Sequence, residues 1–565
     1  MDNNFQAIVI GAGMSGSWVA KELCDAGVKT LLLDRGPEVV HVRDYPTTTL
    51  NPWEFERGGK VTAAEKAANP ILSRCYAYGE ESEHFFVKDA EQPYVQEKPF
   101  DWIKGYQVGG KSLMWARQTQ RWSEFDFAGP KRDGFAVDWP IRYSDIKEWY
   151  DKVETFVGIS GEMDGLDALP DGIFLKSLGL NCVDYHLKEV LKENYDNRHY
   201  IYARCAHLTD PQEIHLKQGR GKCQNRLLCV RGCPYGAYFS ANSSTIPWAK
   251  KTGNLTLVPN SVVHSILYDE QTGKASGVKV IDANTKEETV YSGAYIFVNA
   301  GAINTNAILL NSKSDRFPDG LGNDNKLLGK YFAFHNYRSR VTAVCPDFSD
   351  KVEEGKSPSN GYIPRFRNLY KQDQKFKRGY AVAMYCSRSF DVDSKGVGEG
   401  LVKEFLKEKN FGPWEVYALM MGETIPLESN QISLHPTEVD KYGIPLVNFN
   451  IDYSENELLM MEDFYEQMED LFEKAGFTEI KRIDTKQAPG LDIHEMGGVR
   501  MGHDPETSLL DKWGQLHTCK NVIVSDGACM TSTATQNPSL TYMALAARAA
   551  NHVIDAMKSN GEIES

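Results

Sequence analysis

This chain of 565 residues has no long apolar run, no excess of positive charge and no internal repeat, and these absences exclude several classes of function. No stretch approaches the ~18 consecutive apolar residues that a membrane-spanning helix needs. The 63 basic residues are outnumbered by 77 acidic ones, and a net charge of −14 leaves no basic stripe for nucleic acid or an anionic membrane. The composition, 41 % hydrophobic and 25 % charged, is that of a globular enzyme.

The first 40 residues predict a strand, a glycine-rich turn, a helix and a second strand. Four apolar residues, 7–10, suit a buried strand, residues 17–26 have a helical pattern, and residues 29–33 form a strand that ends at Asp34. No basic leader with a cleavage site precedes the first strand. We therefore expect either a cytoplasmic protein or one that is exported on a signal-bearing partner.

The turn has the spacing G-x-G-x-x-G at Gly11, Gly13 and Gly16. In this context Gly11 permits a tight turn, Gly13 lets a pyrophosphate approach the backbone, and Gly16 lets the helix pack close to the strand. The helix N-terminus would face the phosphates, and Asp34 would accept hydrogen bonds from a ribose. The order of these parts favours a dinucleotide site over a glycine-rich turn in some other α/β protein.

The pattern changes in the second half of the chain. Short alternating strands are expected at residues 338–344, 380–385, 415–421 and 431–434, and a long amphipathic helix at 455–475. This arrangement predicts an antiparallel sheet with helices on one side. Residues 41–100 are rich in Pro, Glu and aromatics with poor periodicity, which indicates a long ordered lid or loop.

Stretches spread over nearly the whole chain resemble the glucose-methanol-choline (GMC) flavin oxidoreductases. They are the N-terminal G-x-G-x-x-G, the loop Gly105-x-x-Val108-Gly109-Gly110-x-Ser112, the turn Ala300-Gly301-Ala302 before a predicted helix at 306–310, and a C-terminal run with His494-Glu-Met-Gly-Gly, Ser525-Asp526-Gly527 and Asn537-Pro538-Ser539. Within this family the chain is most similar to bacterial sugar dehydrogenase catalytic subunits of the glucoside 3-dehydrogenase, FAD glucose dehydrogenase and gluconate 2-dehydrogenase type.

The resemblance implies an α/β fold, in which a Rossmann-type FAD-binding domain is joined to an α+β substrate domain built on an antiparallel sheet. Both domains would be discontinuous. The expected ranges are 1–40, 101–125, 250–330 and 490–565 for the FAD-binding domain, 41–100 for the lid, 126–170 and 331–489 for the substrate domain, and 171–249 for an insertion that contains the cysteine run.

The resemblance also implies that the cofactor is FAD and not NAD. The motif at Gly11 alone cannot distinguish the two. Some family members attach the flavin covalently through a histidine two residues after the serine of the Gly-Gly loop. Here that position is Met114, so we expect non-covalent binding. The residues expected to contact FAD are Gly11, Gly13, Met14, Ser15, Gly16, Asp34, Arg35, Gly109, Gly110, Ser112, Met114, Trp115, Val263, Ala300, Gly301, Asp526, Gly527, Asn537, Pro538 and Ser539.

By the same resemblance, His494 is the base that takes the hydroxyl proton while a hydride passes to flavin N5, and Asn537 hydrogen-bonds the same substrate oxygen. A histidine suits this task because its ordinary pKa lies near neutrality. Outside this motif, His494 would read as a structural histidine in a glycine-rich turn. Asn537-Pro538 also has the pattern of a helix start, with Asn as the cap. A capping role would compete with substrate for the same amide oxygen.

Three cysteines, Cys223, Cys229 and Cys233, follow the spacing C-x5-C-x3-C-P. A zinc site would need four ligands, and a disulfide would leave one thiol over, so an iron–sulfur cluster or a loop that has kept no metal is the better interpretation. FAD glucose dehydrogenase subunits have this spacing around a 3Fe–4S cluster, which implies the same cluster here. Four nearby cations would raise its reduction potential: Arg220, Lys222, Arg226 and Arg231.

Together these features predict an FAD-dependent dehydrogenase that oxidises a sugar or glycoside hydroxyl, with C3 of a glucoside as the best guess. Electrons would leave through the cluster to a cytochrome-type acceptor, and a small signal-bearing subunit would carry the chain to the periplasm. The alternatives are oxidation of glucose C1 or gluconate C2, an oxidase that uses O₂ without a cluster, and a flavoprotein scaffold or lyase. Aromatics that could stack on a sugar, or simply pack in the core, are Trp115, Tyr385, Trp414 and Tyr417.

Overall fold

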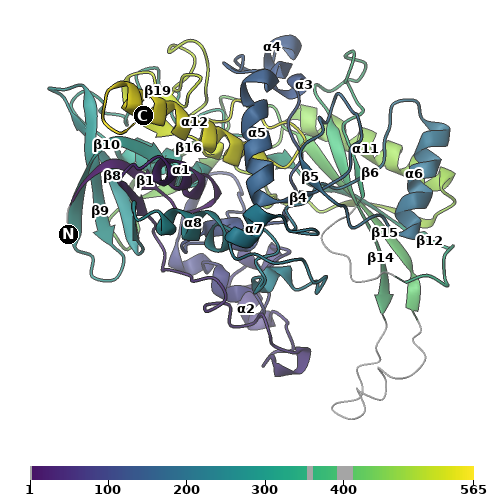
Figure 1. The fold of residues 1–565 in the computed structure, drawn as a ribbon. Coiled ribbons are helices and arrows are strands. Elements are labelled where there is room, and N and C mark those ends of the chain that lie inside the picture. Colours follow the sequence, from purple (N-terminus) through teal and green to yellow (C-terminus); the bar gives the residue numbers. More distant parts are fainter. Residues whose placement is uncertain (1–2, 353–360, 391–410, 565) are drawn as a thin grey trace.

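The computed structural model describes residues 3–352, 361–390 and 411–564, and it contains two large β-sheets. In Figure 1 the first sheet lies on the left of the molecule and the second on the right. The N-terminal and C-terminal segments both belong to the first half, so the chain leaves this half, builds the second, and returns. No helix in the described ranges combines the length and apolarity needed to cross a bilayer.

The first sheet takes its eight strands from three separated parts of the chain. They are β1 (Asn4–Ile10), β2 (Thr30–Leu33), β7 (Leu255–Val258), β8 (Ser261–Asp269), β9 (Lys274–Asp282), β10 (Glu288–Val298), β19 (Gln515–Leu516) and β20 (Cys519–Val524). The order is β19-β20-β10-β1-β2-β7, with β9 and β8 following from β10. Strands β20, β10, β1, β2 and β7 run parallel, so their carboxyl ends share one edge.

Helices cover this parallel core. They are α1 (Met14–Asp25), α5 (Tyr143–Val157), α8 (Thr245–Lys251), α9 (Ala302–Asn311) and α12 (Ser539–Ser559). Helix α1 packs on β1, β2 and β10 and against α8 and α12, and α5 packs against α12. The central strands are apolar without alternation, as in Ala7–Ile10 and Val522–Val524, because a parallel sheet covered on both faces has no solvent side.

The second sheet is antiparallel, in the order β18-β12-β15-β14-β13-β6, with β11 paired to β15. Its strands are β6 (Ile201–Tyr202), β11 (His335–Asn336), β12 (Ser339–Cys345), β13 (Gly361–Ile363), β14 (Tyr380–Phe390), β15 (Phe411–Glu423) and β18 (Thr478–Asp484). The helices α6 (Cys182–Asn194) and α11 (Glu455–Lys474) pack on one face. The antiparallel sheet with helices on one side, predicted from the sequence, is therefore confirmed.

Strand β14 shows how this sheet is two-sided. Tyr380, Val382 and Met384 belong to the core under the helices, while Ala381 and Ala383 belong to a smaller cluster on the opposite face. Successive side chains of a strand point to opposite faces, so one strand serves both the core and the other side of the sheet. That other side faces the candidate active site described below.

One predicted strand belongs elsewhere. The strand expected at 431–434 exists as β16 (Gln431–Val439), but it pairs with β17 (Pro445–Asn450), which in turn pairs with β3 (Val95–Gln96), in a separate three-stranded sheet. Periodicity identified the strand but could not identify its partners, because pairing depends on contacts distant in sequence.

The segment 41–100 packs around a cluster of Tyr45, Leu72, Phe85 and neighbouring residues. It contains α2 (Ala63–Ala68) and several short turns. The remaining short elements are α3 (Glu124–Phe127), α4 (Gly129–Asp133), α7 (Glu213–Lys217), β4 (Ile159–Ser160) and β5 (Phe174–Leu175), with 3₁₀ turns at Pro52–Glu54, Leu72–Arg74, Glu83–Phe85, Asp89–Glu91, Gly110–Leu113, Cys229–Arg231, Ala241–Ser243 and Gly527–Cys529.

Candidate active site

A cavity of about 820 Å³ runs from the carboxyl edge of the first sheet to the second sheet. At one end it is lined by residues that directly follow parallel strands, namely Gly11 after β1, Asp34 after β2 and Asn299 after β10. At the other end it is lined by Leu419 and Met421 of β15. In open α/β sheets, ligands bind beyond the carboxyl ends of the strands, which is where this cavity lies.

Three helices begin at this cavity without a side-chain cap. Helices α1, α9 and α12 start at Met14, Ala302 and Ser539, each of which lines the cavity, and within the described ranges none has a side-chain hydrogen bond from its cap residue. An uncapped helix start presents free N–H donors and a partial positive charge. The cavity therefore offers several sites for phosphate or other anionic oxygens of a ligand.

Backbone conformation and close contacts explain the glycines of the first turn. Gly11 has a φ of +95°, and a Cβ on Gly16 would lie 1.8 Å from the Gly11 carbonyl oxygen, so neither position can accept a side chain. A Cβ on Gly13 would meet nothing within 4 Å and would occupy open space of the cavity. Asp34 accepts hydrogen bonds from Ala12 N (2.9 Å) and Gly36 N (3.0 Å), and burial raises its pKa to about 6. This cradle fits a dinucleotide.

The second glycine loop touches the first. Gly110 would place a Cβ 3.5 Å from Gly13 Cα, and a Cβ on Gly109 would overlap the Asn242 side chain. The Ser112 hydroxyl donates to Gly109 O (2.6 Å) and accepts from Ala241 N (3.0 Å), so it holds the loop in place.

Most of the residues expected to contact FAD line the cavity. They are Gly11, Gly13, Met14, Ser15, Asp34, Arg35, Gly110, Ser112, Met114, Trp115, Val263, Ala300, Gly301, Asp526, Gly527, Asn537 and Ser539. Gly16, Gly109 and Pro538 are not among its lining residues.

The two predicted catalytic residues are in direct contact. Asn537 Nδ2 lies 3.1 Å from His494 Nε2, and both side chains line the cavity. Asn537 Oδ1 is buried and, within the described part of the chain, has no hydrogen-bond partner. The expectation that Asn537 caps the last helix is wrong, because Pro538 occupies the cap position and no side chain caps α12. The contact with His494 uses the Asn537 amide instead, and the competition between capping and substrate binding does not arise.

A second histidine, which sequence analysis missed, fixes the proton on His494. His335 Nε2 lies 3.0 Å from Thr533 O and 3.1 Å from Ala534 O, and carbonyl oxygens only accept, so Nε2 carries the proton. In neutral His335, Nδ1 is then an acceptor, and it lies 2.8 Å from His494 Nδ1. His494 must therefore carry its proton on Nδ1, which leaves a lone pair on Nε2, the nitrogen beside Asn537.

Burial keeps this histidine pair neutral. Burial lowers the pKa of His494 well below its usual value, and the nearby Lys111 cation and a protonated His335 would each lower it further. Burial likewise lowers the pKa of His335 to about 4. Asp492 accepts hydrogen bonds from the backbone N–H groups of His335 (2.9 Å) and His494 (3.3 Å), and burial raises its pKa to about 7. A neutral imidazole with a lone pair on Nε2 is the form required of a general base.

The aromatic residues proposed for sugar stacking divide into two groups. Trp115, Tyr385 and Tyr417 line the cavity, and the rings of the two tyrosines lie 6.0 Å apart. Trp414 is 1 % exposed and belongs to the core under the helices of the second sheet. Trp414 is therefore a packing residue.

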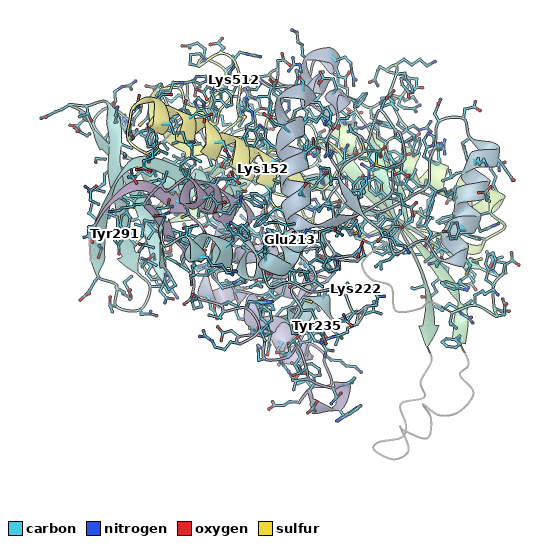
Figure 2. All side chains as sticks on the ribbon, viewed as in Figure 1. Lys152, Glu213, Lys222, Tyr235, Tyr291 and Lys512 are labelled. Atoms are coloured by element: carbon cyan, nitrogen blue, oxygen red, sulfur yellow. The ribbon has the colours of Figure 1, made fainter. Side chains whose placement is uncertain are left out.

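The three cysteines of the run line a second, small cavity of about 30 Å³ together with His207. All eleven cysteines are free thiols, which removes the disulfide interpretation. Among the described residues, no group of three His, Cys, Asp or Glu side chains could hold a metal ion. Figure 2 labels Lys222 and Tyr235, on either side of the run, in the lower part of the molecule beside the purple segment of residues 41–100.

The flanking cations are less available than expected. Arg231 is paired with Glu81 (2.6 Å), and Arg220 is buried and donates to the carbonyls of Gly236 and Val157 (both 2.8 Å). Arg226 donates to Thr48 O (2.6 Å). The cations therefore fasten the run to the lid segment and to the first half of the molecule.

Residues that sequence analysis did not identify also line the main cavity, and they include Arg117, Tyr337 and Arg340. Tyr337 lies between the catalytic pair and the second sheet, since its hydroxyl is 3.4 Å from Asn537 Nδ2 and its ring is 5.3 Å from that of His494. None of them, nor His335, belongs to a recognisable motif. For the residues near β11 and β12, the sequence offers only a polar side chain within an otherwise strand-like stretch, and this does not indicate a functional role.

Two models of one protein family match this chain. The N-terminal GMC oxidoreductase model matches residues 5–336 and the C-terminal model matches residues 426–546. The chain is 27 % identical to 2-methyl-1,2-propanediol dehydrogenase of Mycolicibacterium austroafricanum (97 % of this chain, 94 % of the relative), 25 % identical to the fructose dehydrogenase large subunit of Gluconobacter japonicus (98 % of each), and 24 % identical to 6'''-hydroxyparomomycin C oxidase of Streptomyces lividus (97 % and 91 %).

The family models cover most of the chain, and the expected fold and enzyme class are confirmed with them. This protein is therefore a member of the GMC oxidoreductase family, an α/β enzyme that oxidises alcohol or sugar hydroxyls with FAD.

Proposed function

We propose that this protein is an FAD-dependent dehydrogenase of a sugar or glycoside hydroxyl in which His494 is the base. One observation carries the proposal: the His494 Nε2 lone pair, fixed by His335, faces the same cavity whose other end fits a dinucleotide. FAD, when bound, supplies the two-electron acceptor for the hydrogen removed from the substrate carbon. The residues that would hold it are those of the two glycine loops, Asp34 and the starts of α1, α9 and α12.

The chain's own residues would handle the proton. A substrate hydroxyl between His494 and Asn537 would donate to Nε2 while its oxygen accepts from Asn537 Nδ2, replacing their present 3.1 Å contact. When Nε2 takes the proton, Nδ1–H remains hydrogen-bonded to His335 Nδ1, so the ring does not turn.

The names of the relatives support a polyhydroxy substrate, since they include a diol, fructose and an aminoglycoside. Within this class we propose C3 of a glucoside as the first candidate, with glucose C1 and gluconate C2 as alternatives. Trp115, Tyr385 and Tyr417 in the cavity wall support the binding of a sugar ring.

For the electron exit we propose an iron–sulfur cluster, of the 3Fe–4S type, held by Cys223, Cys229 and Cys233. The support is that all three thiols line one cavity. A cluster distributes its thiolates over several irons, so its ligands stand farther apart than those of a single ion. A relative named as a large subunit supports a partner subunit, and with it transport to the periplasm and a cytochrome-type acceptor. The relative named as an oxidase supports the alternative, direct use of O₂ without a cluster. A cytoplasmic location is the alternative to the periplasm.

The test of the proposed function is an anaerobic screen of free sugars, polyols and glycosides against the holoenzyme. Flavin absorbance reports oxidation, and NMR identifies the ketone or lactone formed. A substrate should bleach the flavin and yield one defined product. If no polyhydroxy compound bleaches it, the dehydrogenase proposal is wrong and a scaffold or lyase role gains support.

Replacement of the base should separate chemistry from cofactor binding. His494→Ala should slow flavin reduction about 10²–10⁴-fold, because the hydroxyl proton loses its acceptor. The measurement is anaerobic stopped-flow absorbance at saturating substrate, with FAD content as the control. Near-wild-type reduction would remove His494 from the base role.

His335 should act as a positioning residue. His335→Leu removes the acceptor of His494 Nδ1–H and should lower the rate of flavin reduction roughly 10–100-fold. This is less than the loss expected when the base itself is removed, because His494 is still present but is no longer held in its tautomer. His335→Gln offers both an acceptor oxygen and a donor N–H, and should restore most of that rate. Rate, KM and melting temperature are measured for both variants. An equal loss in both, or a loss that follows the melting temperature, would indicate a structural role only.

The pH profile should reflect the depressed pKa of the base. His494 works in its neutral form, and its pKa is lowered, so the neutral form persists to lower pH than for an ordinary histidine. The acid limb of kcat/KM should therefore lie below pH 6.5. Asp492, with a pKa of about 7, also titrates in this range, and Asp492→Asn keeps an acceptor oxygen for the N–H groups of His335 and His494 while Gly490 N, which donates to Oδ1 (3.1 Å), loses its acceptor. A limb at or above pH 6.5 that survives in Asp492→Asn contradicts the assignment.

Iron content tests the proposed electron exit. Anaerobically purified protein should contain ~3 irons per chain, and Cys229→Ser should lose the cluster signal while sparing flavin reduction in a single turnover. Cys182→Ser is the matched control, because Cys182 is a half-buried thiol on α6, outside the run. Iron-free wild-type protein would exclude the cluster and favour the oxidase.

A further inference from the structure

Two guanidinium groups line the main cavity without a carboxylate partner. Arg117 follows the second glycine loop, and Arg340 lies on β12. Among the described residues, neither is within ion-pair distance of any Asp or Glu. Arg117 is only 6 % exposed, and its Nε and Nη1 are buried without a hydrogen-bond partner.

Among the described residues, other buried arginines without a carboxylate partner, such as Arg220, Arg500 and Arg548, do not line the main cavity. Arg121 is paired with Glu154, and Arg365 and Arg378 share Glu423. A guanidinium cannot lose its proton, and a buried charge without a partner is costly. Unpaired buried donors that line a ligand cavity therefore point to a ligand that brings the missing negative charge.

Arg340 is tied to the catalytic pair. Its Nη1 donates to the backbone oxygens of Tyr337 and Ser339 (3.2 Å for the latter), its Nη2 donates to Gln487 Oε1 (3.3 Å), and its Nε is buried without a partner. All of these acceptors are neutral, so the charge remains uncompensated. Because Tyr337 contacts both Asn537 and His494, a group held by Arg340 is close to the base.

The surroundings of Arg340 identify this as the substrate end of the cavity. The guanidinium lies 5.9 Å from the ring of Tyr417, which in turn packs against Tyr385, and all three line the cavity. The nucleotide cradle is formed by other residues, and the lysine beside the Gly-Gly loop, Lys111, is already paired with Glu495 (2.8 Å).

We infer that the substrate of the proposed dehydrogenase is a polyhydroxy compound with an anionic oxygen group, a carboxylate or a phosphate, which Arg117 and Arg340 bind while its hydroxyl faces His494. This inference rests on the proposed function and narrows its substrate class. Guanidinium groups suit both anions, because their N–H donors match two oxygens at once.

The test uses pairs of compounds that differ only in the charged group. D-Gluconate is compared with D-glucitol for the carboxylate, and D-glucose 6-phosphate with D-glucose for the phosphate. Affinity is measured by calorimetry on the FAD-loaded His494→Ala protein, in which binding is read without turnover, and anaerobic flavin reduction is measured on the wild-type holoenzyme. The anionic member of at least one pair should bind 10–100-fold more tightly, as expected for charged hydrogen bonds.

Substitutions assign the preference to the two arginines. The ratio of affinities is the affinity for the anionic member of a pair divided by that for the neutral member. Arg117→Gln and Arg340→Gln should each reduce this ratio by about 10-fold or more, and Arg117→Lys and Arg340→Lys should retain part of the preference for the anion. Arg74→Gln is the matched control, because Arg74 also lines the cavity but is already paired with Asp101 (2.9 Å), and it should leave the ratio unchanged. FAD content and melting temperature are recorded for each variant.

The outcomes are distinct. Equal affinity for both members of each pair overturns the inference and leaves the proposed function standing. Tighter binding of the anion without flavin reduction by any compound supports the anion site and overturns the dehydrogenase proposal.

Arg117 has a candidate second role at the cysteine run, because its charge lowers the pKa of the Cys223 and Cys229 thiols against the rise that burial causes. If Arg117→Gln loses iron and keeps the ratio of affinities, Arg117 serves the cysteine run, and the inference fails for that residue.

Discussion

The constraint on which the structure depends is the shared edge of a parallel sheet. Strands β1, β2, β10 and β20 all end on the same side, and covering helices bury their apolar runs on both faces. The chain must therefore turn at this edge after every strand. Each turn brings a loop and, for α1, α9 and α12, an uncapped helix start to one place. The cavity is a consequence of this topology before any side chain is considered.

The second sheet supplies what the first cannot. A parallel sheet covered on both faces has no free surface for a substrate, whereas the antiparallel sheet packs its helices on one face only. Its other face carries the wall of tyrosines and Arg340. The short strand β11 joins the two halves, because its pairing with β15 fixes His335 and its hydrogen bond to Asp492 fixes the loop that carries His494. The base is thus positioned by both halves together.

The sequence predicts those parts of the site whose causes are local. Gly11 and Gly16 are required by backbone conformation and close approach within one turn, so spacing alone reveals them. His494 and Asn537 followed from a family resemblance, and their contact depends on the fold. The helix expected at 306–310 begins at Ala302, because its start is set by the strand end before it and not by its own apolar pattern. Similarly, Asn537 has the local pattern of a cap, but its contact with His494 prevails over that preference.

His335 shows why the remainder could not be predicted. A single histidine in a strand-like stretch usually indicates a satisfied core residue, and only the two carbonyls of Thr533 and Ala534 reveal what this one does. Those carbonyls determine which nitrogen of His335 carries its proton, this determines the tautomer of His494, and the tautomer determines which nitrogen faces the substrate. The chemistry of the site therefore rests on backbone oxygens some 200 residues away in sequence from the ring that they orient. Such a chain of hydrogen bonds forms only when the chain is folded, so it could not be predicted from the sequence. The same is true of Arg117 and Arg340, because only the folded structure shows that no carboxylate of the described residues lies beside them.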